Sequence, residues 1–260
     1  MKLSIVIPVY NSEGILESLN KRIFEVIAMM ELTNNFEVIL INDHSNDDSW
    51  IKIKNLSKHH RYIKGINLNQ NYGQHNAIMA GLNNCSGEFV ITIDDDLQHP
   101  PEFFPEVLKQ LSNHDVCYTN YNKRKHLFWK KAVSKLNNLF SSFLLSKPLS
   151  VYMSSFRGLK KSVVKEIIKY KYPNVYLDGL ILRSTKNIGM INVDHHARKV
   201  GNSNYTLKKL LILWSNMLWD FSFLPFRPAS IFGISLKYTI KFLRKENIKN
   251  QYEIIEKINF

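Results

Sequence analysis

Short apolar runs rich in Ile and Val alternate with segments of helical periodicity over the first 120 residues. The apolar runs cover residues 3–9, 36–41, 62–68 and 89–93, with a weaker fifth run at 115–119. Between them, apolar residues recur at spacings of three or four, as in Ile15, Leu19, Ile23, Ile27 and Met30. Strands and helices alternating at this size predict βαβ units, and therefore an α/β fold with a mostly parallel sheet flanked by helices.

Polar side chains follow each of the first four apolar runs. The four strand ends read Tyr10-Asn11, Asn42-Asp43-His44-Ser45, Asn69-Gln70-Asn71-Tyr72-Gly73 and Asp94-Asp95-Asp96-Leu97-Gln98. Ligands of open α/β sheets bind beyond the carboxyl ends of the strands, so this pattern predicts a polar binding site at that edge. Turn and helix-cap chemistry, which also uses Asn, Asp and Gly, is the alternative for any one of these ends.

The pattern changes after residue 120. Residues 123–126 form a basic stretch, and residues 127–145 show one apolar helical face. A further strand-and-helix region covers residues 151–193. The polar and charged residues 244–260 predict a surface helix or a tail.

An amphipathic segment lies near the C-terminus. Residues 206–224 place a stripe of Leu, Trp and Phe opposite Lys208 and Lys209. This pattern is typical of a basic helix at a membrane interface, and also of a core helix in a soluble domain. We therefore expect an α/β domain over residues 1–200, followed over 201–260 by amphipathic helices that are peripheral to a membrane.

The acidic strand end predicts a metal site. Like charges this close raise one another's pKa, and a divalent cation relieves the repulsion. Alternate side chains of an extended segment share a face, so Asp94 and Asp96 can reach one metal, with Gln98 nearby, while Asp95 points elsewhere. Oxygen ligands suit Mg²⁺ or Mn²⁺, and Mg²⁺ commonly takes one or two carboxylates plus substrate phosphates. The cluster therefore predicts a nucleotide-diphosphate substrate, with an acidic turn capping a helix at residues 100–102 as the alternative.

Composition and charge narrow the class of protein. The chain has 260 residues, of which 45% are hydrophobic and 12% aromatic, as in a globular protein. Its 35 Lys and Arg against 22 Asp and Glu give a net charge of +13, which favours a phosphorylated substrate, an anionic membrane surface or a nucleic acid as partner. Two cysteines provide no disulfide framework, so a reducing cytosol is expected. The sequence has no GxxxxGK, GxGxxG, CxxC, HExxH or GxSxG pattern, which argues against P-loop, dinucleotide-dependent and zinc or serine hydrolase chemistry.

Several segments resemble family 2 glycosyltransferases, which have the GT-A fold. The run Ser4-Ile5-Val6-Ile7-Pro8-Val9-Tyr10-Asn11 is similar to the opening of that family. Residues 42–47, Asn-Asp-His-Ser-Asn-Asp, resemble its Asp-Asp-x-Ser-x-Asp turn, and Asn71-Tyr72-Gly73 resembles its Asn-x-Gly segment. The resemblance extends over residues 1–228 and implies a nucleotide-sugar-binding domain.

One signature points to a subgroup of that family. Residues 94–102, Asp-Asp-Asp-Leu-Gln-His-Pro-Pro-Glu, resemble the Asp-x-Asp-Leu-Gln-x-Pro-Pro-Glu motif of polyprenyl-phosphate sugar transferases and dolichol-phosphate mannose synthases. Ser155-Phe156-Arg157 and the Arg198-x-x-Gly201-x-Ser203 pattern are similar to the acceptor-side motifs of the subgroup. The sequence departs from this pattern in the turn, where Asn42 replaces the first acid and His44 replaces a Gly, and at Asn204, which replaces a Lys after Ser203. Many members of the subgroup also continue into transmembrane helices after a Pro-x-Arg segment, whereas here Pro225-Phe226-Arg227 is followed by a short apolar stretch that Lys237 and Lys241 interrupt.

The resemblance implies roles for the matching positions. The implied nucleotide-binding residues are Pro8, Tyr10, Asn11, Asp43, Asn71, Gly73, Asp94 and Asp95. The implied ligands of Mg²⁺ or Mn²⁺ are Asp96, Gln98 and Asp94, and the implied catalytic residues are Asp96, Asp94 and Asp178. Arg157 and Arg198 would hold the acceptor phosphate, since the planar fork of Arg binds phosphate bidentately.

These roles imply inverting, metal-dependent transfer of a sugar from a UDP-, dTDP- or GDP-linked donor. The predicted acceptor is a polyprenyl phosphate resembling undecaprenyl phosphate, which is anionic at neutral pH because its second pKa is near 6. The alternative acceptor is a sugar hydroxyl in cell-surface polysaccharide synthesis, which needs a general base, and Asp178 is the candidate. We expect a peripheral location on the inner face of the cell membrane. We expect no nucleic-acid partner, since the sequence has no helix-turn-helix, zinc-finger or RNP pattern.

Overall fold

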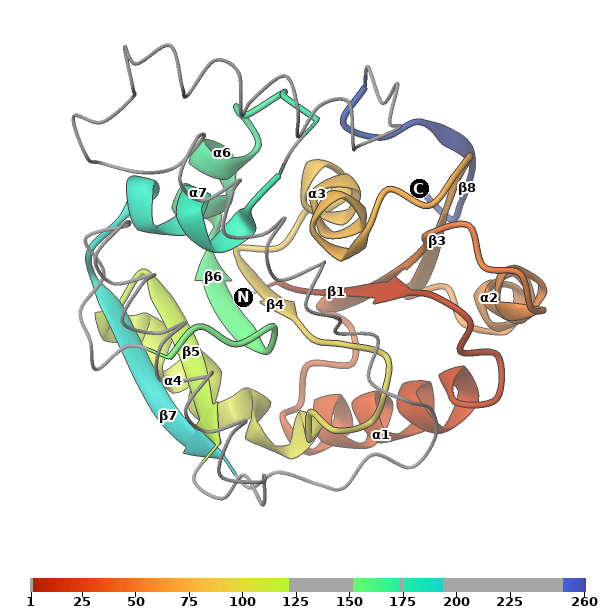
Figure 1. Ribbon diagram of the computed structural model, residues 1–260. Coiled ribbons are helices and arrows are strands. Elements are labelled where there is room, and N and C mark those ends of the chain that lie inside the picture. Colours follow the sequence, from red (N-terminus) through yellow and green to blue (C-terminus); the bar gives the residue numbers. More distant parts are fainter. Residues whose placement is uncertain (1, 122–151, 174, 194–249) are drawn as a thin grey trace, which may run out of the picture.

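Eight strands form one sheet in the order β7-β5-β6-β4-β1-β2-β3-β8. The computed structural model describes residues 2–121, 152–173, 175–193 and 250–260 (Figure 1). The strands are β1 (Leu3–Val9), β2 (Phe36–Asn42), β3 (Ile63–Leu68), β4 (Phe89–Thr92), β5 (Val116–Tyr121), β6 (Arg157–Lys160), β7 (Ile188–Val193) and β8 (Ile254–Ile258). The helices are α1 (Leu16–Met29), α2 (Ser49–His59), α3 (Gln74–Asn84), α4 (Phe104–Asn113), α6 (Lys161–Ile167) and α7 (Leu177–Ser184), with a 3-10 turn, η1 (Pro101–Phe103), before α4.

The centre of the sheet is parallel, as predicted. β1 pairs in parallel with β2 and β4, β2 pairs in parallel with β3, and β5 pairs in parallel with β7. The exception inside the sheet is β6, which runs antiparallel to both of its neighbours, β4 and β5. The predicted mixed α/β fold with helices on both faces is therefore confirmed.

Two apolar cores lie on opposite faces of this sheet. Alternate residues of β1 face opposite sides, so Ile5 and Ile7 pack with α1, α2 and α4, whereas Val6 packs with α3, α6 and α7. All three residues are fully buried. A strand buried on both faces has apolar residues at every position, which explains the uninterrupted runs in the sequence.

The prediction of a helix or tail over residues 244–260 is wrong for its last part. Residues Ile254–Ile258 form β8, which pairs antiparallel with β3 at the edge of the sheet (Figure 1). Only one side of an edge strand is paired, and the three residues between Ile254 and Ile258 are exposed. Glu256 and Lys257 interrupt the apolar pattern, so the sequence shows no continuous apolar run at this strand. β8 belongs to the same sheet as β1 to β7, although it lies beyond the predicted boundary at residue 200.

Several predictions fall on residues that the structure does not describe. These are the basic stretch 123–126, the apolar helical face over 127–145, the acceptor-side motif that begins at Arg198, and the amphipathic segment 206–224. The C-terminal interfacial helices therefore remain a prediction. Among the described residues, no helix has both the length and the apolar character needed to cross a bilayer.

A buried carboxylate cross-links the sheet at the edge opposite to the polar strand ends. Glu37 in β2 is 2% exposed and pairs with Lys64 Nζ at 2.8 Å. Its Oε1 accepts hydrogen bonds from the Ser4 hydroxyl at 2.5 Å and from the Ser86 N–H at 2.7 Å. Burial opposes ionisation of Glu37, but Lys64, Ser4 and Ser86 outweigh it and lower the pKa from 4.5 to about 2.

We expect Glu37→Gln to lower the free energy of unfolding by about 3 kcal/mol at pH 7, because a lowered pKa stabilises the fold wherever the group is ionised. This contribution is complete above pH 4.5 and is lost as the pH falls toward 2. Urea unfolding at several pH values measures it. The difference in free energy of unfolding between the wild type and Glu37→Gln should become smaller below pH 4.5. A difference that stays constant down to pH 3 would contradict this account.

Candidate active site

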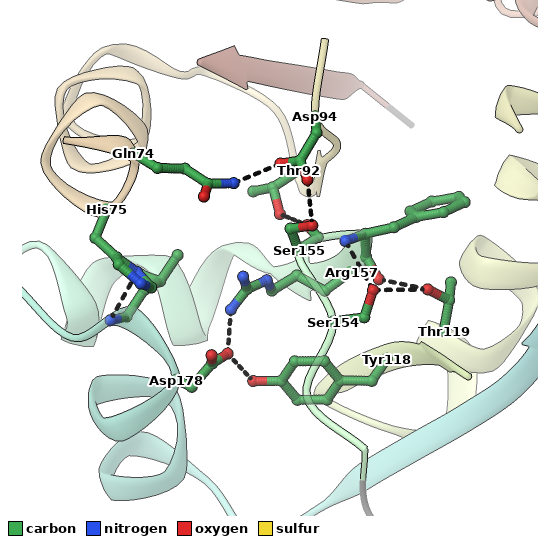
Figure 2. Close-up of polar contacts among 12 residues, drawn as sticks. Gln74, His75, Thr92, Asp94, Tyr118, Thr119, Ser154, Ser155, Arg157 and Asp178 are labelled. Atoms are coloured by element: carbon green, nitrogen blue, oxygen red, sulfur yellow. Dashed lines mark hydrogen bonds and ion pairs between the residues drawn. The ribbon is translucent and has the colours of Figure 1, made fainter. Parts of the chain in front are cut away.

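The carboxyl ends of β1, β2, β3 and β4 meet at one edge of the sheet because these strands are parallel. β6 joins that edge by its opposite end, since it runs antiparallel to β4 and places Arg157 opposite Thr92. Figure 2 shows side chains from α3, from the end of β4, from the start of β6 and from α7 turned toward one another. The polar strand ends predicted from the sequence therefore converge, together with a segment that comes much later in the chain.

The turns after β1 and β2 are held together by reciprocal hydrogen bonds. The Asn11 N–H donates to Ser45 Oγ at 3.0 Å, and the Asn46 N–H donates to Asn11 Oδ1 at 2.8 Å. Asn11 has φ +54°, in the left-handed region that Asn tolerates. Tyr10 is 40% exposed beside it, whereas Pro8 is buried within β1. Tyr10 and Asn11 thus line the predicted edge, and Pro8 lies inside the sheet below it.

The two departures in the turn after β2 have a structural basis. Asn42 Oδ1 accepts the Ser45 N–H at 3.3 Å, so Asn42 caps the turn as an Asp would. His44 has φ +57°, a left-handed conformation that glycine adopts without steric cost. This explains why a Gly would suit the position, and the exposed His44 keeps the same turn.

Asp43 holds the loop between β3 and α3. It is 3% exposed, and its two carboxylate oxygens accept the backbone N–H groups of Tyr72 at 2.7 Å and Gly73 at 2.8 Å. The Asn71 side chain donates to the Asp43 carbonyl at 3.2 Å. Burial raises the pKa of Asp43 even though these two backbone bonds act to lower it. Gly73 has φ +84°, so the loop needs a residue without a Cβ there.

Asp95 ties the acidic loop after β4 to the end of β1. Its Oδ2 accepts the Ser12 hydroxyl at 2.6 Å and the Tyr10 N–H at 3.2 Å. Burial raises the pKa of Asp95 to about 6, with a further rise from the charges of Asp94 and Asp96. Asp95 thus points away from its two neighbours, as the sequence predicts, and the loop carries an electrostatic cost that a cation would relieve.

Asp94 is engaged by residues from two other elements. Its Oδ1 accepts the Gln74 side-chain amide at 2.5 Å, and its Oδ2 accepts the Ser155 hydroxyl at 2.6 Å (Figure 2). Its backbone N–H donates to His99 Nδ1 at 3.1 Å. The carboxylate therefore has one fixed orientation, between the first turn of α3 and the segment that leads into β6.

Asp96 and Gln98 follow on a sharply bent loop. Asp96 Oδ1 accepts the Gln98 N–H at 3.1 Å, and the intervening Leu97 is buried with φ +59°. In the part of the chain that the structure describes, no group of three or more His, Cys, Asp and Glu side chains could hold a metal ion. The predicted cation ligands Asp96 and Gln98 both lie on this bend, and their oxygens together with those of a bound substrate would suit the coordination habits of Mg²⁺.

Arg157 and Asp178 form a buried ion pair. Arg157 Nη1 contacts Asp178 Oδ1, and the two residues are 2% and 9% exposed. The Tyr118 hydroxyl donates to the same Asp178 oxygen at 2.8 Å, and the Tyr118 ring lies 5.5 Å from the Arg157 guanidinium carbon. Although burial disfavours its charge, Asp178 raises the pKa of Arg157. The Nε of Arg157 is buried with no hydrogen-bond partner among the described residues, so the guanidinium is only partly satisfied.

Comparison with known proteins identifies the family. The model of glycosyl transferase family 2 matches residues 4–168, which include every strand end described above and the Arg157 segment. The chain belongs to glycosyl transferase family 2. The predicted resemblance to this family is thereby confirmed, and the acidic loop after β4 lies within the matched residues.

Relatives extend the similarity beyond the family domain. This glycosyltransferase is 33% identical over 234 residues to undecaprenyl-phosphate 4-deoxy-4-formamido-L-arabinose transferase of Photorhabdus laumondii, covering 89% of this chain and 71% of the relative. It is 32% identical over 236 residues to the enzyme of the same name from Pseudomonas syringae, covering 90% and 69%. Its fold is similar to that of glucosyl-3-phosphoglycerate synthase from Mycobacterium tuberculosis, solved with Mn²⁺, UDP and glucosyl-3-phosphoglycerate, with a TM-score of 0.60 and 18% identity over 84% of this chain and 77% of that one.

The glycosyltransferase site also contains residues that the sequence did not single out. Gln74 and Tyr118 bind predicted site residues directly, and His75 Nδ1 accepts the N–H of Leu177, next to Asp178, at 3.4 Å. Gln74 and His75 directly follow Gly73, at the start of α3. Their position in the first helical turn after a predicted binding loop could have marked them as site residues. Tyr118 had no such signal, because it lies inside the strand β5 and not in one of the polar segments that follow the strands.

Proposed function

We propose that this glycosyltransferase moves a sugar from a UDP-linked donor to undecaprenyl phosphate. The observation that carries the proposal is the similarity to undecaprenyl-phosphate sugar transferases over 234 residues, which extends beyond the family domain at residues 4–168. UDP is the proposed nucleotide because the synthase with a similar fold was solved with UDP. The sugar to test first is 4-deoxy-4-formamido-L-arabinose.

The ion pair at Asp178 favours a phosphate acceptor over a hydroxyl acceptor. A sugar hydroxyl must lose a proton during transfer, and a general base has to reach it. The Asp178 carboxylate is buried, and its Oδ1 is already engaged by Arg157 and Tyr118. A lipid phosphate is ionised at neutral pH and attacks without a base. Asp178 is thus proposed to hold Arg157, in place of the base role that a hydroxyl acceptor would require.

On the donor side, two turns and one loop would surround the nucleotide. Tyr10 and Asn11 are exposed at the end of β1 and would contact the base and ribose, above the buried Pro8. Asp43 has both oxygens on backbone N–H groups, so we propose that it acts by holding Asn71 and Gly73 against the nucleotide. Asp95 would act in a similar way, by fixing the Tyr10 backbone.

Asp96 and Gln98 would bind a divalent cation, Mg²⁺ or Mn²⁺, together with the donor diphosphate, and Asp94 would orient a ribose hydroxyl or a metal-bound water. When bound, such a cation neutralises the diphosphate that leaves. The closeness of three carboxylates on one loop supports this assignment, since a divalent cation relieves the repulsion between them. The rest of catalysis would come from in-line positioning of the acceptor against the anomeric carbon, with inversion.

Arg157 and Arg198 would bind the acceptor phosphate. The Nε of Arg157, which has no partner among the described residues, is a donor that a phosphate oxygen would satisfy. The net charge of +13 supports attraction to an anionic membrane surface, where the lipid acceptor resides. We propose that the enzyme works there as a peripheral protein on the inner face of the membrane, with the predicted amphipathic segment at residues 206–224 as the contacting part.

The test is transfer by the full chain to undecaprenyl phosphate in detergent micelles. UDP-linked 4-deoxy-4-formamido-L-arabinose and a panel of other UDP-, dTDP- and GDP-sugars are supplied with Mn²⁺ or Mg²⁺, and the lipid product is measured by mass spectrometry. We expect a product in which the sugar is linked to the prenyl phosphate, and we expect EDTA to abolish its formation. Transfer to a saccharide hydroxyl without any lipid-linked product would favour the alternative acceptor and overturn the proposal.

A further inference from the structure

We propose that Ser155 and Gln74 are positioning residues that fix the Asp94 carboxylate and connect the donor side of the site to the acceptor side. The inference rests on the proposed function, because it assigns Asp94 to the donor. Each Asp94 oxygen receives one side-chain hydrogen bond, from Gln74 at 2.5 Å and from Ser155 at 2.6 Å. A carboxylate oxygen accepts two hydrogen bonds, so each keeps a site for a substrate hydroxyl or water.

Ser155 is held in place by the strand next to it. The Thr92 hydroxyl of β4 donates to the Ser155 carbonyl at 2.7 Å, and β4 and β6 pair from Thr92 and Arg157 onward. Ser155 is therefore fixed relative to both Asp94, two residues after Thr92, and Arg157, two residues after Ser155. A shift of the acceptor-binding Arg157 would be transmitted to Asp94 through this short connection.

Gln74 makes the matching contact from the donor side. It is the first residue of α3 and follows Gly73, whose N–H is bound by Asp43. Its side chain is exposed and loses rotamer entropy when it is held in the hydrogen bond to Asp94, so this contact costs conformational freedom that a role in positioning Asp94 would explain. The Asp94 carboxylate is thus a junction of three elements: α3, the loop after β4 and the segment before β6 (Figure 2).

The neighbouring Ser154 provides a matched control. Its Oγ accepts hydrogen bonds from the Thr119 hydroxyl and the Phe156 N–H, both at 3.2 Å, and it is 6% exposed. Figure 2 shows Ser154 turned toward Thr119 and Ser155 turned toward Asp94. Loss of the Ser154 hydroxyl therefore perturbs the core and not the Asp94 junction.

The test compares Ser155→Ala, Gln74→Ala and Ser154→Ala by calorimetric titration with UDP in the presence of Mn²⁺, which requires no acceptor. We expect the first two changes to weaken UDP binding about tenfold, as losses of outer contacts to site residues typically do, and Ser155→Thr to restore it. Ser154→Ala should change UDP affinity less than about twofold while lowering the melting temperature.

A double-mutant cycle shows whether Ser155 acts through Asp94. In an Asp94→Ala background, Ser155→Ala should have less than about a twofold further effect on UDP affinity. Equal losses from Ser154→Ala and Ser155→Ala, an unchanged affinity in Ser155→Ala, or full additivity with Asp94→Ala would each overturn the inference. Failure of the wild-type enzyme to use undecaprenyl phosphate would count against the proposed function alone, since the cycle is read from nucleotide binding.

Discussion

Asp178→Ala is expected to lower the free energy of unfolding by about 3–5 kcal/mol, because removal of one partner of a buried ion pair leaves the other charge uncompensated. Arg157 is 2% exposed and its Nε already lacks a partner in the described structure, so the guanidinium would keep few of its hydrogen bonds in the variant. The same substitution removes the acceptor of the Tyr118 hydroxyl, which is also buried. Urea unfolding monitored by circular dichroism measures the loss.

The control is the double variant Arg157→Met with Asp178→Leu, which replaces the pair by apolar side chains of similar size. Such replacements are often close to neutral, so the double variant should be more stable than Asp178→Ala by at least about 2 kcal/mol. A double variant as unstable as the single one would show that the destabilisation comes from packing around α7 and not from an uncompensated charge.

Activity separates this structural role of Asp178 from a catalytic one. Asp178→Asn keeps an oxygen that can accept from Tyr118 and Arg157, so transfer to undecaprenyl phosphate should fall less than about tenfold. A general base contributes about 10²–10⁴-fold, and a loss of that size with a stable fold would show that Asp178 has a catalytic role and not a structural one alone. The pH dependence of the variant gives a second readout, since loss of a base removes the acidic limb of the profile.

Asp96→Ala is expected to lower transfer about 10³-fold, corresponding to roughly 4 kcal/mol of lost stabilisation of the leaving diphosphate. Asp94 is oriented by Gln74 and Ser155, whereas Asp96 lies on the same bend as Gln98, whose N–H it accepts. The proposal therefore places the cation at Asp96, and this substitution tests it. Initial rates with excess Mn²⁺ and a UDP-sugar measure the loss. Titration with UDP should show that Mn²⁺ strengthens binding to the wild type but not to the variant.

Glu106→Ala is the matched control, because Glu106 is an exposed acid in the first turn of α4, outside the acidic loop. Its activity and Mn²⁺ dependence should equal those of the wild type. Retention of full Mn²⁺-dependent activity by Asp96→Ala would show that the cation is bound elsewhere, and the donor-side assignment of Asp96 and Gln98 would have to be abandoned.

The central strands were predictable because a strand that is buried on both faces has apolar residues at every position, which appear in the sequence as a continuous apolar run. The run 3–9 coincides with β1, and the runs for β2 to β5 differ from the strands by at most two residues at either end. The acidic loop was equally readable, and Asp95 diverges from Asp94 as alternation in an extended segment predicts. β8 was missed because an edge strand with exposed positions shows no continuous apolar run; here the exposed residues are Ile255, Glu256 and Lys257.

The contacts within the site were less predictable than its location. Asp43 was expected to bind the nucleotide, yet its oxygens hold the backbone of Tyr72 and Gly73, which come much later in the chain. Arg157 was expected to meet a phosphate, yet it is also the partner of Asp178. A residue type and its neighbours along the chain indicate the chemistry of a side chain, but the group that it contacts depends on which distant segment folds against it.

The sequence by itself determined the α/β class, the parallel centre of the sheet and the edge at which the polar strand ends gather, because each follows from the local period of apolar residues and from the geometry of parallel strands. Only the tertiary structure decided that β6 enters the sheet antiparallel between β4 and β5. That placement brings Ser155 to Asp94, and it brings Arg157 to Asp178 and Tyr118. Which strands pair depends on how segments far apart in the chain bury their apolar surfaces against each other. The local pattern of apolar residues does not contain that information.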